Sequence, residues 1–106
     1  MPRKLAEVLV AKGVQARTAE SQGWKDLTNG DLVEAAVRAG FSCVLTRDRL
    51  FSESAARSLR RFPEFCVVLI TVPQLRGHEF LDTFQTEWDR RPILPVHGAV
   101  VRWPGP

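Results

Sequence analysis

Residues 65–71 read FCVVLIT and belong to the longest apolar run of the chain, which has the length of a strand. A second run, residues 41–46, reads FSCVLT. Neither run alternates apolar and polar side chains, and unbroken runs are typical of strands that helices cover on both faces. We therefore predict two buried strands of a parallel sheet.

Before, between and after these two runs, apolar residues recur at helical spacing, and Gly or Pro marks the ends of the segments. The pattern predicts helices over residues 2–12, 29–40, 52–61 and 75–88, and further strands over residues 14–18 and 97–103. Helices and strands then alternate along the whole chain. This order predicts an α/β fold with a small, mainly parallel sheet flanked by helices.

Length and composition favour one domain over residues 1–106, with residues 104–106 as a frayed tail. The apolar fraction of 44% argues against disorder, and no apolar run is long enough to cross a membrane. The N-terminus lacks the apolar core of a signal peptide. We therefore expect a cytoplasmic protein without membrane contact, in which Cys43 and Cys66 stay reduced as core residues.

Arginine supplies twelve of the fifteen basic residues, and the net charge is +3. Five arginines fall within residues 47–61, and arginine forks match the geometry of phosphates. We expect Arg47, Arg49 and Arg57 to contact nucleic acid. The alternative is a solvated helix face.

Carboxylates follow the predicted strands and begin the predicted helices. Asp48 lies two residues after the strand that ends at Thr46, where parallel sheets place their ligands, but a helix-capping role also fits it. Asp31 and Glu34 share one helix face, either as joint metal ligands or as exposed acids. Converging carboxylates would suit Mg²⁺ or Mn²⁺ and phosphodiester hydrolysis. Zinc is disfavoured, because neither histidine has a Cys or an acid at ligand spacing.

Two stretches resemble one small family. Residues 23–32, GWKDLTNGDL, and residues 41–48, FSCVLTRD, are similar to motifs of the DUF5615 PIN-like proteins, which are toxin-type nucleases. The motifs occur in the family's order and spacing, and the likeness covers residues 2–72. The family pattern is a Gly-Trp, then Asn-Gly-acid-Leu, then a strand ending in Thr-x-Asp.

The resemblance implies a PIN-like fold and a metal-dependent ribonuclease that hydrolyses RNA phosphodiester bonds with Mg²⁺ or Mn²⁺. Asp31 and Asp48 would be its catalytic residues and metal ligands, with Asn29 as a neutral ligand and Glu34 assisting. It also implies RNA and an antitoxin protein as partners. A homo-oligomer is a further expectation.

One family feature is absent. Members begin with a strand that ends in Leu-Asp-Glu-x-x-Pro and carries the first metal ligand, whereas this sequence begins at the position of that proline, Pro2. A late start codon, a strand donated by another chain, or a rearranged, non-catalytic relative would each account for this. The alternative function is therefore a pseudo-nuclease that serves as an RNA-binding or protein-interaction module.

Overall fold

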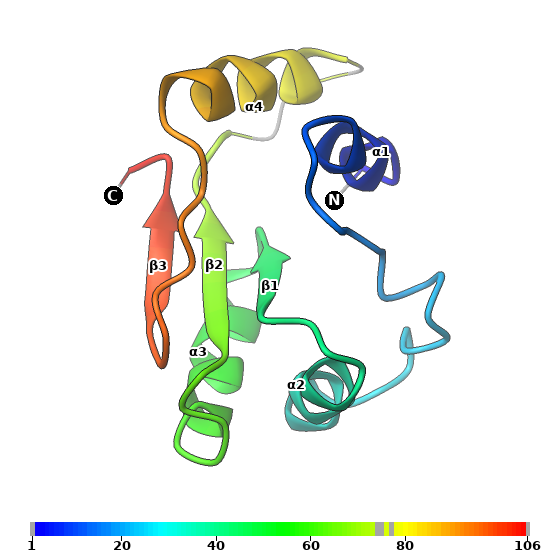
Figure 1. Cartoon of the computed structure of the whole chain (residues 1–106), viewed down its shortest axis with the longest axis vertical. Coiled ribbons are helices and arrows are strands. Elements are labelled where there is room, and N and C mark those ends of the chain that lie inside the picture. Colours follow the sequence, from blue (N-terminus) through cyan, green and yellow to red (C-terminus); the bar gives the residue numbers. More distant parts are fainter. Residues whose placement is uncertain (1, 74–75, 77, 106) are drawn as a thin grey trace. The chain divides into compact units, whose positions relative to one another are not determined.

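The computed structural model describes residues 2–73, 76 and 78–105 (Figure 1). Helices and strands follow one another along the chain with a single consecutive helix pair near the beginning. The elements are α1 (Lys4–Ala11), α2 (Asn29–Arg38), β1 (Cys43–Thr46), α3 (Arg49–Ser58), β2 (Cys66–Ile70), α4 (Glu79–Arg90) and β3 (Val100–Trp103). The predicted α/β class is confirmed.

The three strands form one parallel sheet in the order β1-β2-β3. All five residues of the central strand β2 are buried, whereas the four residues of β1 are half-buried. A central strand between two neighbours has no solvent-facing side once both sheet faces are covered, which explains why residues 65–71 do not alternate. In the register, Cys43 lies opposite Cys66 and Thr46 opposite Leu69.

Contacts within the chain gather into two compact units. One comprises Met1–Asp26 and Val72–Pro92 and contains α1 and α4. The other comprises Leu27–Thr71 and Ile93–Pro106 and contains the sheet with α2 and α3. One domain over residues 1–106 stays a prediction.

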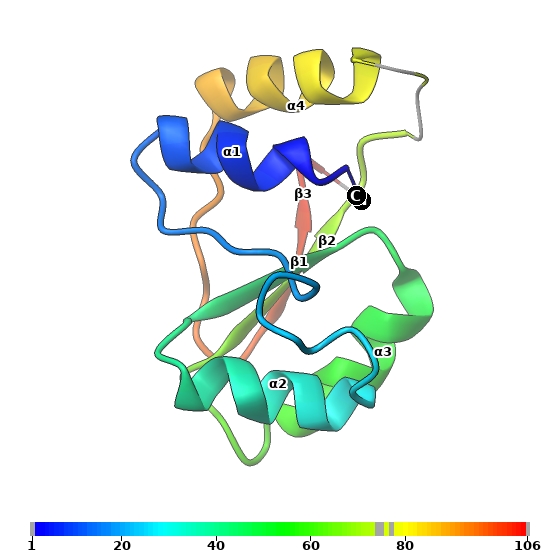
Figure 2. The same ribbon diagram turned by 90° about the vertical axis from the view of Figure 1, so that its right-hand side faces the viewer.

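The sheet unit has a continuous apolar core. Helices α2 and α3 lie side by side, and α3 packs against β2 and β1 (Figure 2). Val33 of α2 and Ala55 of α3 are fully buried. The segment before β3 is anchored to the central strand region, because Gly98 N–H donates to the Phe65 carbonyl at 2.8 Å. These contacts bury β2 between elements far apart in the sequence.

The helical unit is held by an apolar seam between α1 and α4, which lie side by side (Figure 1). Leu5 and Leu9 of α1 and Phe80 and Phe84 of α4 are buried. An ion pair between Lys12 Nζ and Asp89 Oδ1, 2.9 Å apart, links the ends of these helices.

The predicted strand over residues 14–18 is wrong. This segment has no strand structure; the Thr18 hydroxyl accepts from Ser21 N–H at 3.0 Å, and the Thr18 carbonyl accepts from the Ser21 hydroxyl. The backbone of residues 14–18 finds no strand partner among the described residues, so local side-chain hydrogen bonds prevail.

Element ends also differ from the prediction. Helix α3 begins three residues early, at Arg49, because the Asp48 side chain caps it. Strand β3 begins only at Val100, because Gly98 adopts a positive φ of 75°. Helix α4 begins at Glu79, and the predicted start at Leu75 lies outside the described residues.

The frayed tail expected from Pro104 is wrong for Gly105. The Thr71 hydroxyl donates to the Gly105 carbonyl at 2.7 Å, and the backbone N–H of Thr71 donates to Trp103. Residue 106 lies outside the described part of the chain. In that part, no helix combines the length and the apolar character that crossing a membrane requires.

Two glycines with positive φ provide a matched test of the fold. Gly98→Ala should lower the free energy of unfolding by more than roughly 2 kcal/mol, because the new Cβ adds a clash to the left-handed backbone cost. That Cβ would lie 3.0 Å from the Pro63 carbonyl oxygen. Gly40 also has a positive φ, of 90°, but an added Cβ there would meet open space. Gly40→Ala should therefore lower the free energy of unfolding by only about 1–2 kcal/mol. Urea unfolding measures both; equal losses would contradict the close approach at Gly98.

Candidate functional site

Asp48 stands at the carboxyl end of β1, as predicted, and its side chain caps α3. Its Oδ1 accepts from Leu50 N–H at 2.9 Å and from Phe51 N–H at 3.1 Å, and its own N–H donates to Thr46 Oγ1 at 3.0 Å. The Thr-x-Asp motif is therefore a strand-to-helix turn in which each polar side chain satisfies backbone N–H groups. The capping role proposed for Asp48 is present in the structure.

The other predicted ligands lie on α2. Thr28 caps this helix by accepting from Asp31 N–H at 3.3 Å, and Asp31 itself is exposed in the first turn. Asn29 is the first helical residue and is half-buried. Glu34 accepts from Arg61 at 3.0 Å and also faces Arg38 at 3.7 Å. Ion pairing with arginine is thus the visible role of Glu34.

The structure does not bring Asp48 together with the α2 acids. Gly30, next to Asp31, lies beside Ser58 at the last turn of α3, since a Cβ on Gly30 would be 3.6 Å from Ser58 Oγ. Asp48 caps the first turn of the same helix. Ten helical residues rise about 15 Å, far beyond the reach of one metal ion. Within residues 2–73, 76 and 78–105 no group of three or more His, Cys, Asp or Glu side chains is placed to hold a metal.

Arginines gather near the end of α3 that lies opposite Asp48. We call Arg38, Arg57, Arg60 and Arg61 the arginine cluster. Arg57, Arg60 and Arg61 follow one another around the last turn of α3, which continues through hydrogen bonds from Arg60 N–H to Arg57 and from Arg61 N–H to Ser58. Arg38 and Arg61 converge on the two oxygens of the Glu34 carboxylate.

Two members of the arginine cluster remain available for a ligand. Arg57 and Arg60 are exposed, and neither forms an ion pair with the described residues. Arg49, by contrast, lies at the other end of α3 and faces Glu53 at 3.8 Å. Arg47 is half-buried between β1 and α3. Of the three arginines predicted to contact nucleic acid, only Arg57 therefore belongs to the cluster.

The arginine cluster was only partly visible in the sequence. Helical spacing relates Arg57 to Arg60 and Arg61, but Arg38 joins them only because α2 packs against α3. No sequence signal links residues 38 and 61.

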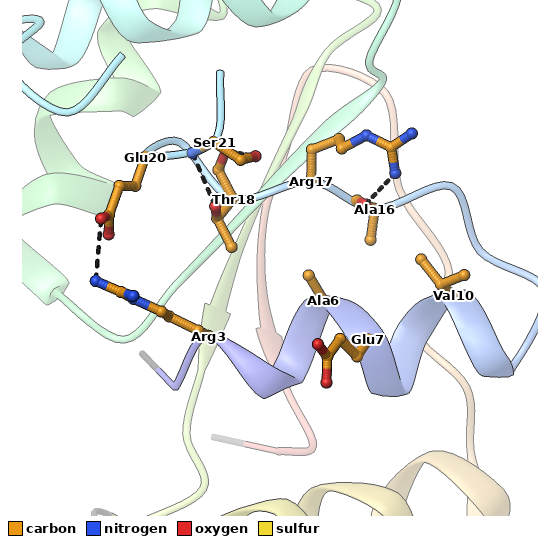
Figure 3. A pocket seen from close by; sticks show the side chains of 9 residues that line it. All are labelled: Arg3, Ala6, Glu7, Val10, Ala16, Arg17, Thr18, Glu20 and Ser21. Atoms are coloured by element: carbon orange, nitrogen blue, oxygen red, sulfur yellow. Dashed lines mark hydrogen bonds and ion pairs between the residues drawn. The ribbon is translucent and has the colours of Figure 1, made fainter. Parts of the chain in front are cut away.

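A groove of about 490 Å³ lies in the helical unit, between α1 and residues 16–21 (Figure 3). Figure 3 shows Arg3, the residue before α1, reaching Glu20, with a nitrogen–oxygen distance of 3.0 Å. Ala6 and Val10 contribute apolar side chains to its lining, and Glu7 and Arg17 contribute side chains of opposite charge. None of the predicted site residues lines this groove.

The two cysteines, predicted only as core residues, lie on neighbouring strands as a pair. Cys43 and Cys66 are opposite one another in β1 and β2, and both are free thiols. The hydrogen bond between them lowers the pKa of Cys66 to about 6, helped by Val96 N–H and opposed by burial. The same hydrogen bond, together with burial, raises the pKa of Cys43.

We compared the chain with known proteins. No model of a protein family matches this chain, and neither the curated proteins nor the solved structures include a match. What the structure itself shows is a small α/β fold with a three-stranded parallel sheet.

The capping role of Asp48 predicts a difference between two substitutions. Asp48→Ala removes the acceptor of two backbone N–H groups and should lower the free energy of unfolding by about 1 kcal/mol. Asp48→Asn should change it by only a few tenths of a kcal/mol, because asparagine caps helices as well as aspartate does. Denaturant unfolding of both variants checks this. A large loss in Asp48→Asn would mean that the negative charge, and not the cap, stabilises the turn.

Proposed function

We propose that this chain is an RNA-binding module that contacts phosphates through the arginine cluster and does not cleave its ligand. The observation that carries the proposal is that the arginines are grouped, whereas the acids predicted to hold a metal are not assembled. Four arginines gather around one end of the α2–α3 pair, whereas Asp48 lies a helix length away from Asp31. Phosphate binding needs the former arrangement, and metal-dependent hydrolysis needs acids in one place.

Electrostatics within the cluster favour an anionic ligand. One carboxylate, Glu34, pairs with two of the four arginines, Arg38 and Arg61, so the cluster keeps an excess of positive charge. Glu34 is also half-buried, and it holds Arg38 and Arg61 in place by ion pairs. Guanidinium groups held in this way lose less entropy when they bind phosphate. Arg57 and Arg60 complete the contact surface, because both are exposed beside the ion-paired arginines.

The sequence resemblance to the DUF5615 PIN-like proteins supports a nucleic-acid ligand. In that family the ligand is RNA, and a chain that keeps the motifs without an assembled set of acids would keep binding and lose hydrolysis. RNA is therefore the polyanion that we propose, in preference to a phosphorylated protein.

A second candidate is the metal-dependent ribonuclease itself, and one observation favours it. Asp48 is exposed at the carboxyl end of β1, where parallel sheets hold their ligands, and its Oδ2 accepts no hydrogen bond from the described residues. That oxygen would bind Mg²⁺ or Mn²⁺, with further ligands from outside the described chain. The antitoxin partner and the homo-oligomer that we expect from the sequence belong to this candidate.

RNA binding should depend on salt and on the arginine cluster. With a short fluorescent single-stranded RNA, the double substitution Arg57→Ala, Arg60→Ala should lower the slope of log affinity against log salt by about 1.4, at about 0.7 per phosphate contact. Fluorescence anisotropy over a salt series measures the slope. Arg102→Ala is the matched control, because Arg102 is exposed on β3, which is the edge strand opposite β1. A slope that is unchanged in the double variant would refute the cluster as the RNA contact.

Cleavage distinguishes the two candidates. The same RNA incubated with Mn²⁺ should stay intact with the wild-type chain. Asp48→Asn is the matched variant, because it keeps the helix cap while removing the negative charge. Cleavage that requires Mn²⁺ and disappears in Asp48→Asn would replace the binding proposal by the ribonuclease. Cleavage that persists in Asp48→Asn would exclude Asp48 from the chemistry.

A further inference from the structure

The parallel sheet places two thiols face to face. Cys43 of β1 and Cys66 of β2 occupy the same register position, and registered residues of neighbouring parallel strands point to the same face of the sheet. Neighbouring strands are about 4.8 Å apart, which lies inside the roughly 4.4–6.8 Å that Cα atoms span in a disulfide. The two thiols also shift one another's pKa values, as groups in close proximity do. Their geometry suits a covalent bond.

The surroundings of the two sulfurs differ. Cys66 is fully buried in the central strand, and its Sγ accepts from Val96 N–H at 3.4 Å. Cys43 lies in the edge strand and is half-buried, so a small solute reaches it first. The pair thus combines one accessible sulfur with one that is held in place by a backbone donor.

We propose that Cys43 and Cys66 form a reversible disulfide across β1 and β2, with hydrogen peroxide as the oxidant. The proposal is independent of RNA binding, since neither cysteine belongs to the arginine cluster. It differs from the expectation that both residues serve only as core packing.

The reaction balances with peroxide alone. The Cys43 thiolate attacks one peroxide oxygen, the O–O bond breaks, and hydroxide leaves as Cys43 becomes a sulfenic acid. Cys66 then attacks Cys43 Sγ; the S–S bond forms and the hydroxyl leaves with the Cys66 proton as water. The first hydroxide takes the proton that Cys43 had released. Two thiols have lost two electrons, and one peroxide has become two waters.

The protonation of the pair sets the pH dependence of the first step. One thiolate is stabilised by the remaining S–H of its neighbour and by Val96 N–H, so the pair loses its first proton well below the ordinary pKa of 9.0. The second proton is held, because the hydrogen bond with Cys66, then burial and the charge of the adjacent thiolate, raise the pKa of Cys43. A singly ionised pair is therefore the form present near neutral pH. The Cys43 thiolate is the minor form of this pair, reached when Cys43 passes its proton to Cys66, and its share stays constant while the pair is singly ionised.

The experiment treats the reduced full-length chain with peroxide, removes the peroxide with catalase, and unfolds the chain in a thiol-alkylating reagent. Intact mass should show a monomer about 2 Da lighter that carries no alkyl group and that regains two alkylation sites after dithiothreitol. The rate should also be nearly constant from about pH 7 to about pH 9 in the folded chain, whereas in the urea-unfolded chain it should rise with thiolate ionisation.

The matched control moves one thiol off register. The double substitution Cys66→Ser, Val68→Cys keeps two cysteines on the same sheet face, because Val68 is opposite Leu45. Two residues of rise at about 3.3 Å place this thiol about 8 Å from Cys43, beyond disulfide reach. The control should keep both alkylation sites after peroxide. Cys43→Ser, a second variant that leaves the central strand intact, should give no internal disulfide.

Three results would overturn the proposal. Two alkylatable thiols in the treated wild-type chain would show that the pair does not bridge. Oxidation only to the sulfinic acid, about 32 Da heavier, would show that Cys66 does not capture the sulfenic acid. Equal bridging in the off-register control would show that strand register is not the cause.

Discussion

Burial of β2 on both faces is the constraint on which the rest of this structure depends. Every residue of Cys66–Ile70 is buried, and a backbone buried in this way must find its hydrogen-bond partners in neighbouring strands. Strands β1 and β3 supply them, both parallel to β2. Parallel pairing requires a crossover between strands, so α3 connects β1 to β2 and packs against both.

This constraint also determines where the cysteines, Asp48 and the arginine cluster lie. Register with β2 brings Cys43 opposite Cys66, although 23 positions separate them in the sequence. The end of β1 puts Asp48 at the first turn of α3, and the length of α3 then carries the chain to Arg57 and Arg61 at the opposite end. The same helix thus separates the exposed Asp48 carboxylate from the arginine cluster.

Much of the fold followed from local patterns. The unbroken runs at residues 41–46 and 65–71 indicated two buried strands correctly, and the spacing of Leu5 and Leu9 indicated α1. The strand predicted over residues 14–18 was wrong, because apolar residues at strand spacing form a strand only where a neighbouring strand supplies backbone hydrogen bonds. The start of α3 was also misplaced, because the cap by Asp48 was one of two roles that fitted the same residue.

The sequence by itself determined the α/β class, the two main strands and the presence of Asp48 at a strand end, because these depend on side-chain periodicity and short turn motifs. Only the tertiary structure decided which charged and sulfur-bearing residues meet. Arg38 and Arg61 both pair with Glu34, and Cys43 lies opposite Cys66. Asp31 and Asp48, by contrast, lie a helix length apart. These contacts depend on strand register and helix packing. Register and packing follow from the burial of apolar surface by the whole unit, not from any local sequence signal.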